Sequence, residues 1–149
     1  MDEVHAKEIL AATLRRPDQK QALRISREVY QACNGVLNGR ILDAYLYGSY
    51  ARGDYHDDSD IDIFFVVDAA VEEIGLLRQK IADIESDLSL KYDVTISVAV
   101  KPAEQARRYA AVLPYYANVM REGIRIHEAK ETKFAASNDG PQGPGRSEE

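Results

Sequence analysis

Apolar residues recur at spacings of three and four along residues 71–90, which predicts an amphipathic helix. The positions that form this stripe are Ile74, Leu77, Ile81, Ile84 and Leu88. Weaker patterns of the same kind predict helices over residues 3–16 and 18–37. Pro102 and Pro114 can each open one further helix. One-sided helices of this kind are expected to cover the faces of a sheet.

Three other runs have the composition of strands. Residues 41–47 form a β-prone run that stops at Gly48, and residues 61–67 have the β-branched and aromatic content of a buried strand. Residues 93–100 alternate between polar and apolar positions, with Asp93 at the start of the polar side. A short run at residues 124–126 follows the last helix. The chain therefore predicts a mixed α/β fold.

The size and composition of the chain limit what this fold can be. Its 149 residues fit a single core, and 45% apolar residues are enough to build one. No apolar run approaches the roughly 20 residues of a membrane span, and the first residues lack a secretory signal, so we expect a cytoplasmic protein with no membrane partner. The net charge of −6 disfavours nucleic acid as the main acceptor. Residues 128–149, rich in Gly and Pro towards their end, predict a disordered tail.

Gly48 and Ser49 stand where the first strand ends, and a short turn or helix follows them. At such a point backbone N–H groups and a helix dipole can meet a phosphate. Gly48 would let the backbone approach closely, the Ser49 hydroxyl would donate to a phosphate oxygen, and Arg52 would offset its charge. Tyr47 and Tyr50 flank this turn and are candidates for stacking on a base. Alone, a Gly-Ser turn is a weak signal because such turns are common.

Asp60 and Asp62 strengthen the prediction, because a strand's period of two places both carboxylates on one face. Their repulsion at the start of an apolar strand calls for a cation, and oxygen ligands favour Mg²⁺ or Mn²⁺. Asp93 is the candidate third carboxylate on a neighbouring strand, with Thr95 and Ser97 on the same side. Three acids around two metal positions suit phosphoryl chemistry, with Asp93 nearest the attacking group. Solvated strand ends are the plainer interpretation of each acid taken alone.

The order of these motifs resembles the DNA polymerase β nucleotidyltransferase superfamily. Residues 48–53, Gly-Ser-Tyr-Ala-Arg-Gly, and residues 59–63, Ser-Asp-Ile-Asp-Ile, resemble its minimal nucleotidyltransferase branch. The resemblance spans about residues 41–127, the expected nucleotidyltransferase core after an N-terminal helical segment at residues 1–40. It implies a small mixed sheet flanked by helices, ATP with Mg²⁺, Ser49 on phosphate, and Asp60 and Asp62 on metal. Asp93 matches the third carboxylate of the family by pattern.

Many members of this branch resemble antitoxins that transfer AMP to a tyrosine of a partner ribonuclease with a HEPN domain. A HEPN-domain toxin is therefore the expected partner, and adenylyl transfer to a protein hydroxyl the expected activity. An adenylyltransferase that modifies a small molecule, as aminoglycoside-modifying enzymes do, is one alternative. A module that neutralises its partner by docking, without catalysis, is another.

Overall fold

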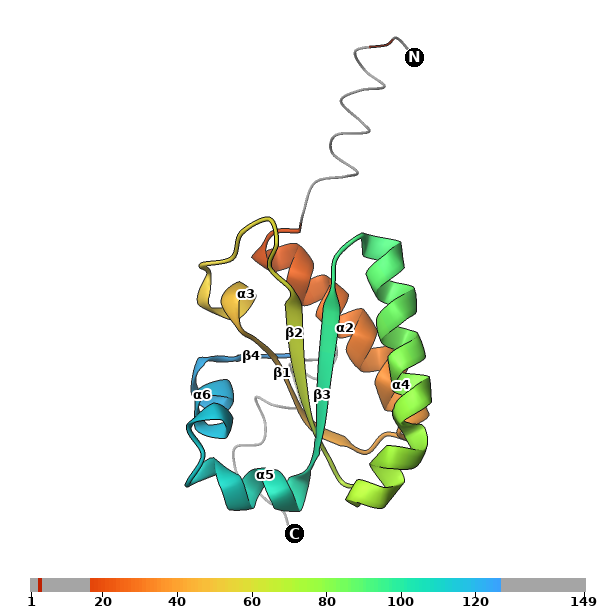
Figure 1. Cartoon of the computed structure of the whole chain (residues 1–149), viewed down its shortest axis with the longest axis vertical. Coiled ribbons are helices and arrows are strands. Elements are labelled where there is room, and N and C mark those ends of the chain that lie inside the picture. The colour runs from red at the N-terminus through yellow and green to blue at the C-terminus, as the bar shows by residue number, and fades with distance from the viewer. Residues whose placement is uncertain (1–2, 4–16, 127–149) are drawn as a thin grey trace, which may run out of the picture.

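The computed structural model describes residue 3 and residues 17–126 (Figure 1). The expected tail and all but residue 3 of the helix expected over residues 3–16 lie outside the described residues. Nine elements follow one another along the described chain: α2 (Gln19–Val36), β1 (Ile41–Tyr47), α3 (Ser49–Arg52), β2 (Ile61–Val67), α4 (Val71–Tyr92), β3 (Ile96–Pro102), α5 (Ala103–Ala110), α6 (Pro114–Glu122) and β4 (Ile124–Arg125). In these residues no helix is long and apolar enough to cross a membrane.

The four strands form one mixed sheet in the order β3-β2-β1-β4. β2 runs parallel to β3, with α4 as the connection between them, and antiparallel to β1. β4 extends the sheet by a short antiparallel pairing with β1. β2 is buried along almost its whole length because it has a strand on each side and helices on each face. The mixed α/β fold and its small flanked sheet are confirmed.

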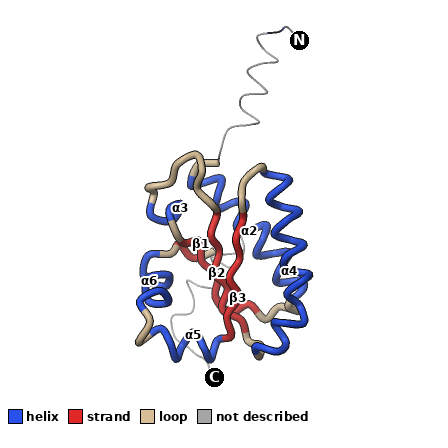
Figure 2. The backbone as a smooth tube through the Cα atoms, viewed as in Figure 1, coloured by secondary structure: helices blue, strands red, loops and turns tan. Residues whose placement is uncertain are grey.

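Helices cover both faces of the sheet (Figure 2). α2 and α4 pack on one face through Ala22, Val29 and Ile81, against residues such as Ile63 and Phe65 of β2. α5 and α6 pack on the other face, where Tyr116 meets Phe64 at a ring-centroid distance of 5.8 Å. Alternate residues of β2 therefore serve opposite cores, as the period of two in a strand requires. Asp62 shares the face of Phe64, so it lies on the side of α5 and α6.

Local sequence signals explain where the two long helices lie. Asp18 caps α2: its side chain accepts a hydrogen bond from the Gln21 N–H, and the Gln21 side chain accepts one from the Asp18 N–H, both at 2.8 Å. The apolar stripe of α4 faces inward as predicted, with Ile74, Ile81 and Leu88 buried. The helices predicted over residues 18–37 and 71–90 are thus confirmed, within one or two residues at each end.

The start of β3 corrects the sequence prediction. Asp93 does not lead the strand but ends α4 in the left-handed conformation, at φ 52° and ψ 47°. Its N–H and that of Val94 both donate to the Ser89 carbonyl, so the chain closes the helix before it extends. Asp tolerates this conformation better than most residues with a side chain. The strand then begins at Ile96 and continues to Pro102.

Candidate active site

The turn between β1 and α3 brings the backbone against a carboxylate. Gly48 adopts φ 76° and ψ −155°, a region open essentially to glycine alone. A Cβ at this position would stand 2.5 Å from Oδ2 of Asp62. Since β1 and β2 are antiparallel, with Tyr47 opposite Asp62, the next residue along β1 necessarily passes this side chain. The first predicted phosphate-binding residue and one predicted metal ligand are therefore direct neighbours.

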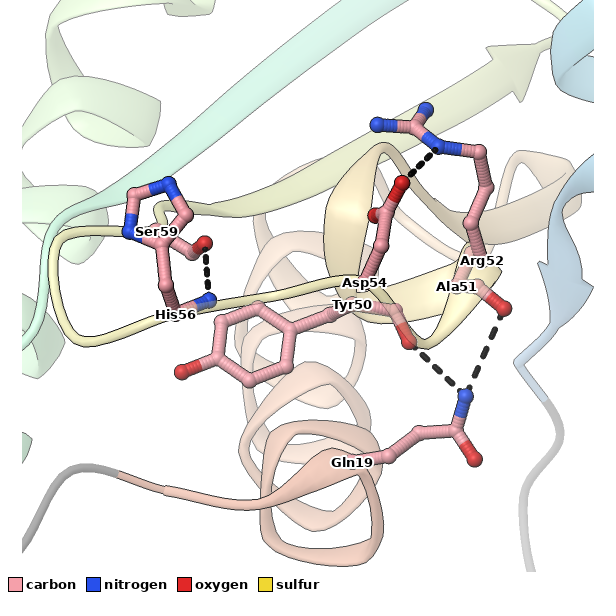
Figure 3. Close-up of polar contacts among 7 residues, drawn as sticks. All are labelled: Gln19, Tyr50, Ala51, Arg52, Asp54, His56 and Ser59. Carbon is pink, nitrogen blue, oxygen red and sulfur yellow. Dashed lines mark hydrogen bonds and ion pairs between the residues drawn. The ribbon is translucent and has the colours of Figure 1, made fainter.

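α3 is a single turn whose ends are fixed by glycines. Ser49 opens it, half-buried, and its carbonyl accepts a hydrogen bond of 2.9 Å from the N–H of Gly53, which is left-handed at φ 89°. Arg52 stands on the last position, and its Nε donates to Asp54 Oδ2 at 3.2 Å (Figure 3). Both side chains of this ion pair are largely exposed, so it contributes little to stability and leaves the guanidinium open to exchange.

Tyr50 anchors this turn to the core instead of facing a ligand. Its ring is buried and stacks on Tyr55 at a centroid distance of 4.6 Å, and its hydroxyl donates to the Pro17 carbonyl at 3.0 Å. The Gln19 amide donates to the Tyr50 carbonyl at 2.8 Å (Figure 3). The suggestion that Tyr50 stacks on a base is therefore wrong, because its ring serves the core under the turn.

The loop from α3 to β2 is held by its own hydrogen bonds. The Ser59 hydroxyl, which is buried, accepts from the His56 N–H at 2.9 Å, and the Ser59 N–H donates to the His56 carbonyl at 3.0 Å (Figure 3). The Nδ1 atom of His56 accepts from the Asp58 N–H at 3.2 Å. Asp57 and Asp58 are exposed. These contacts fix the chain at Ser59, one residue before Asp60 and two before β2 begins at Ile61.

Asp60 and Asp62 differ in their surroundings although they flank the same buried residue. Asp60 is exposed, whereas Asp62 is half-buried between β1 and β3. Burial first, and then the negative charge of Asp60, raise the pKa of Asp62 to about 6, while Arg52 lowers it. A carboxylate that is desolvated and faces a second negative charge gains from a cation beside it.

β3 contributes Ser97 to the surroundings of Asp62. The parallel register sets Ser97 beside Asp62, and the Ile61 N–H donates to the Thr95 carbonyl at 2.9 Å. Asp93 lies two residues before Thr95, exposed, at the same end of the sheet. Within residues 17–126 no three carboxylate, imidazole or thiol side chains are grouped closely enough to hold a metal. The geometry thus joins Gly48 with Asp62, and does not bring Asp93 into one cluster with the other two acids.

An aromatic cluster continues from Asp62 along the same face of the sheet. The Tyr47 and Tyr115 hydroxyls are 3.1 Å apart, and the Tyr115 ring lies edge-on to the rings of Tyr47 and Phe64 at 6.1 and 6.0 Å. Burial and this hydrogen bond raise the pKa of the Tyr47 phenol above its ordinary value. Sequence reasoning missed the position of Tyr115, because nothing local predicts that α6 sets it on β2.

A hollow of about 560 Å³ lies at the opposite end of the sheet. It is lined by the ends of β2 and β3 and the beginnings of α4 and α5, with Glu72, Glu104 and Arg108 among the side chains. None of the predicted site residues reaches it, so the geometry favours the end that holds Gly48 and Asp62.

Comparisons with known proteins bear on this arrangement. A family model described as "Nucleotidyltransferase domain" matches residues 34–126. Two proteins of Methanocaldococcus jannaschii, both named "Putative protein adenylyltransferase", are similar to the chain. One is 38% identical over 79 residues, which are 52% of this chain and 76% of that protein. The other is 35% identical over 97 residues, which are 65% of this chain and 89% of that protein.

A crystal structure titled as "a putative nucleotidyltransferase" of Sulfolobus solfataricus resembles the chain with a TM-score of 0.42 and 19% identity, over 76% of this chain and 86% of that one. The match of the family model decides to which family the chain belongs. It includes the turn at Gly48, both acids of β2 and the chain through β3. The chain therefore belongs to the nucleotidyltransferase domain family and is a nucleotidyltransferase.

Proposed function

We propose that this protein uses Mg²⁺ or Mn²⁺ to transfer AMP from ATP to a protein hydroxyl, a tyrosine of a HEPN-domain ribonuclease, and so acts as its antitoxin. The observation that carries the catalytic part is the approach of Gly48 to Asp62, where a Cβ would stand 2.5 Å from the carboxylate. It sets the phosphate-binding turn directly beside an acid that can take a cation.

The residues of the turn bind and orient the triphosphate. Backbone N–H groups at the start of a helical turn can donate to a phosphate, and the glycine allows the phosphate to come close to them. The Ser49 hydroxyl donates to a phosphate oxygen. Arg52 exchanges its exposed pairing with Asp54 for a phosphate, which is the stronger partner because it carries more charge.

Asp60 and Asp62 would hold the divalent ion. Asp60 directly precedes β2 and Asp62 is the second residue of that strand. Their donors fit a hard cation, because both offer carboxylate oxygen, and neither a thiol nor an imidazole joins them within the described residues. When bound, such an ion offsets the charge of the phosphates and makes an attacking hydroxyl more acidic. Ser97, beside Asp62 on β3, adds a hydroxyl that can bind a metal-held water or a phosphate oxygen.

The reaction is an exchange at the α-phosphorus of ATP. The phenol oxygen of the acceptor forms a bond to this phosphorus, the bond to the bridging oxygen of the β-phosphate breaks, and pyrophosphate leaves with that electron pair. The proton of the phenol passes to a carboxylate and then to water. Asp93 is assigned to this proton, because it is exposed at the end of the sheet where Asp60 stands and is open to an incoming protein.

The choice of a protein acceptor rests on two supports. The relatives of Methanocaldococcus jannaschii are both named "Putative protein adenylyltransferase". The motif at residues 48–63 resembles the branch whose members neutralise HEPN-domain toxins. Ordinary tyrosine has a pKa of about 10, so it needs the help of a metal or a base to attack at neutral pH.

The test is intact-mass spectrometry of a HEPN-domain protein encoded beside this one, after co-expression with it. We expect one added AMP mass, or a small multiple, with the wild type. Asp62→Asn should add none, and Asp93→Asn should add none while its binding of ATP with Mg²⁺, measured by calorimetry, stays within about threefold of the wild type.

Other results would replace the proposal. An unmodified but neutralised ribonuclease in the wild-type sample would point to a docking antitoxin. Turnover of ATP on an added aminoglycoside, with no change in protein mass, would point to a small-molecule adenylyltransferase.

A further inference from the structure

Tyr115 is an aromatic residue held in place yet open to solvent. It stands in the first turn of α6 directly after Pro114, and 45% of it is exposed. Its hydroxyl is fixed by the Tyr47 hydroxyl at 3.1 Å, and its ring is set by edge contacts with Tyr47 and Phe64. A large ring that keeps a fixed orientation while half of its surface meets water is a suitable platform for another flat group.

The position of this ring relative to Asp62 is defined by the sheet. Phe64 lies two residues beyond Asp62 on the same face, about 7 Å along β2. Tyr47 stands directly across from Asp62 on β1, about 5 Å away. Since the Tyr115 ring contacts both Phe64 and Tyr47, it lies on the face of the sheet that carries the Asp62 side chain, in the direction of Phe64 along β2.

The two sides of Asp62 therefore differ in chemistry. On the side of α3 stand Gly48, Ser49 and Arg52, which suit charged phosphates. On the other side, toward Phe64, stands the Tyr115 ring, which is 45% exposed. A nucleoside triphosphate has the same division, with charge at one end and a flat, uncharged base at the other.

Other aromatic residues near the turn cannot take this role. Tyr50 is 1% exposed and already stacked on Tyr55. Tyr47 is half-buried, between the Phe64 and Tyr115 rings. Of the described tyrosines beside Asp62, Tyr115 is the one whose ring is open.

The geometry points to Tyr115 as the residue on which the base of the nucleotide stacks, with the α-phosphate at Asp62 and the triphosphate on α3. This inference rests on the proposed function, because it takes the site to bind a nucleoside triphosphate. Stacking responds to the area of the base, so Tyr115 favours purines over pyrimidines and does not separate adenine from guanine. Its hydroxyl serves to hold the ring against Tyr47.

The chain contains no tryptophan, which allows a direct test. The Tyr115→Trp variant contains a single tryptophan, so its indole fluorescence comes from position 115 alone. A base stacked on this indole should quench its emission. We expect saturable quenching by an ATP analogue with a methylene bridge between the α- and β-phosphates, added with Mg²⁺. Tripolyphosphate with Mg²⁺ binds the same turn without a base and should not quench. Leu76→Trp is the matched control, since Leu76 is 84% exposed on α4, across the sheet, and should not respond.

Calorimetry of two further variants separates the ring from its hydroxyl. Tyr115→Phe should bind the analogue within about threefold of the wild type, whereas Tyr115→Ala should bind it at least about fivefold more weakly. Tripolyphosphate should bind both variants like the wild type. The ratio of affinities for the ATP analogue and its CTP counterpart should fall in Tyr115→Ala.

Several outcomes would overturn the inference. If Tyr115→Ala binds the analogue as tightly as the wild type, or Leu76→Trp is quenched as strongly as Tyr115→Trp, the base does not stack on Tyr115. If Tyr115→Phe alone loses affinity, the hydroxyl contacts the ligand and the ring is not a platform. In these cases nucleotide binding and AMP transfer by the wild type would still stand. A wild type that binds neither the analogue nor tripolyphosphate would remove the proposed function and this inference together.

Discussion

At the scale of single residues, Gly48 shows how a backbone can serve as part of a site. Its positive φ is one reason for a glycine, and the 2.5 Å that would separate an added Cβ from Asp62 Oδ2 is another. Gly39 has the same φ of 76° but open space around it, with no atom within 4 Å of the corresponding Cβ. A comparison of substitutions at Gly48 and Gly39 therefore distinguishes the effect of a positive φ from that of crowding the Asp62 carboxylate.

We therefore predict different results for Gly48→Ala and Gly39→Ala. The strain of a positive φ should lower the free energy of unfolding by about 1–2 kcal/mol in Gly39→Ala and by up to about 3 kcal/mol in Gly48→Ala, whose backbone lies in a region open essentially to glycine alone. Only Gly48→Ala should displace the Asp62 carboxylate, and we expect its kcat/KM for nucleotidyl transfer to fall by about 100-fold. Denaturant unfolding and initial rates measure the two effects. Equal activity of the two variants would mean that the contact with Asp62 has no part in the chemistry.

Asp62 gives a second prediction, for the metal-free protein in EDTA. Its pKa in the folded chain is about 6, above the ordinary value of 3.8, so the folded state binds this proton more tightly than the unfolded state. The free energy of unfolding should therefore fall as the pH rises from about 4 to about 6, and Asp62→Asn should lack this part of the slope. Denaturant unfolding of both proteins across this range measures it. At pH 7 the variant should be at least as stable as the wild type, and a less stable variant would contradict the raised pKa, which burial and then the charge of Asp60 produce.

The candidate site residues that the sequence predicted are those whose position depends on local geometry, and the structure brings Gly48 and Asp62 together. Gly48 comes directly after a strand, and Asp60 and Asp62 are two residues apart, so the positions of all three follow once the strands form. Tyr50 was misplaced because the turn that leaves Ser49 half-buried directs the next side chain into the core. Tyr115 was missed because its contact with Phe64 joins residues that are far apart in the sequence and depends on how α6 packs.

At the scale of elements, the apolar spacing over residues 71–90 predicted α4 and the face that it buries. The stripe of α4 needs only one covered face, so its spacing identifies both the helix and its orientation. The start of β3 was predicted three residues too early, since Asp93 and Val94 continue the alternation of the strand. The alternation of polar and apolar residues indicates which side chains are buried. It does not indicate that Asp93 adopts a left-handed backbone conformation between the helix and the strand.

α4 also protects the open edge of β3. The Ile96 N–H donates to the Ser89 hydroxyl at 3.0 Å, and the Val98 N–H donates to a Glu85 carboxylate oxygen at 2.6 Å. β3 stands at the end of the sheet, so these backbone groups face away from β2. Side chains of one helix thus occupy donors that would otherwise offer an edge for pairing with another chain.

These hydrogen bonds predict that removing the Glu85 carboxylate lowers the free energy of unfolding more than removing the Asp87 carboxylate does. Glu85→Ala should lower the free energy of unfolding by about 1–3 kcal/mol, because it removes a charged acceptor from a partly buried N–H. Asp87→Ala, at an exposed position two residues on, should change it by less than about 0.5 kcal/mol. Denaturant unfolding measures both values, and amide hydrogen exchange should show faster exchange at Val98 in Glu85→Ala only. Unchanged protection at Val98 would show that its N–H does not depend on Glu85.

At the scale of the whole molecule, the site gathers where the parallel strands β2 and β3 begin. The turn after β1 lies at the same end of the sheet because β1 runs antiparallel to β2. This end combines the turn proposed to bind phosphate with acids, in a chain whose net charge is −6. Phosphates and carboxylates repel each other, and Arg52 is the cation close enough to lower the pKa of Asp62.

The binding of ATP should therefore depend on a divalent cation. Without one, the triphosphate meets Asp60 and Asp62 at close range, and the Coulomb energy of like charges opposes binding. With Mg²⁺ or Mn²⁺ present, the same carboxylates attract the metal that the phosphates share. We predict that ATP raises the melting temperature in Mg²⁺ but not in EDTA, since a ligand at about 100 times its Kd stabilises the folded state by about 2.7 kcal/mol. Differential scanning calorimetry measures the melting temperature in four samples, with and without ATP and each in Mg²⁺ or in EDTA. Asp62→Asn in Mg²⁺ is the control, and ATP should not raise its melting temperature. Equal stabilisation by ATP in EDTA would show that the nucleotide binds without the carboxylates, and the assignment of Asp60 and Asp62 to a metal would be wrong.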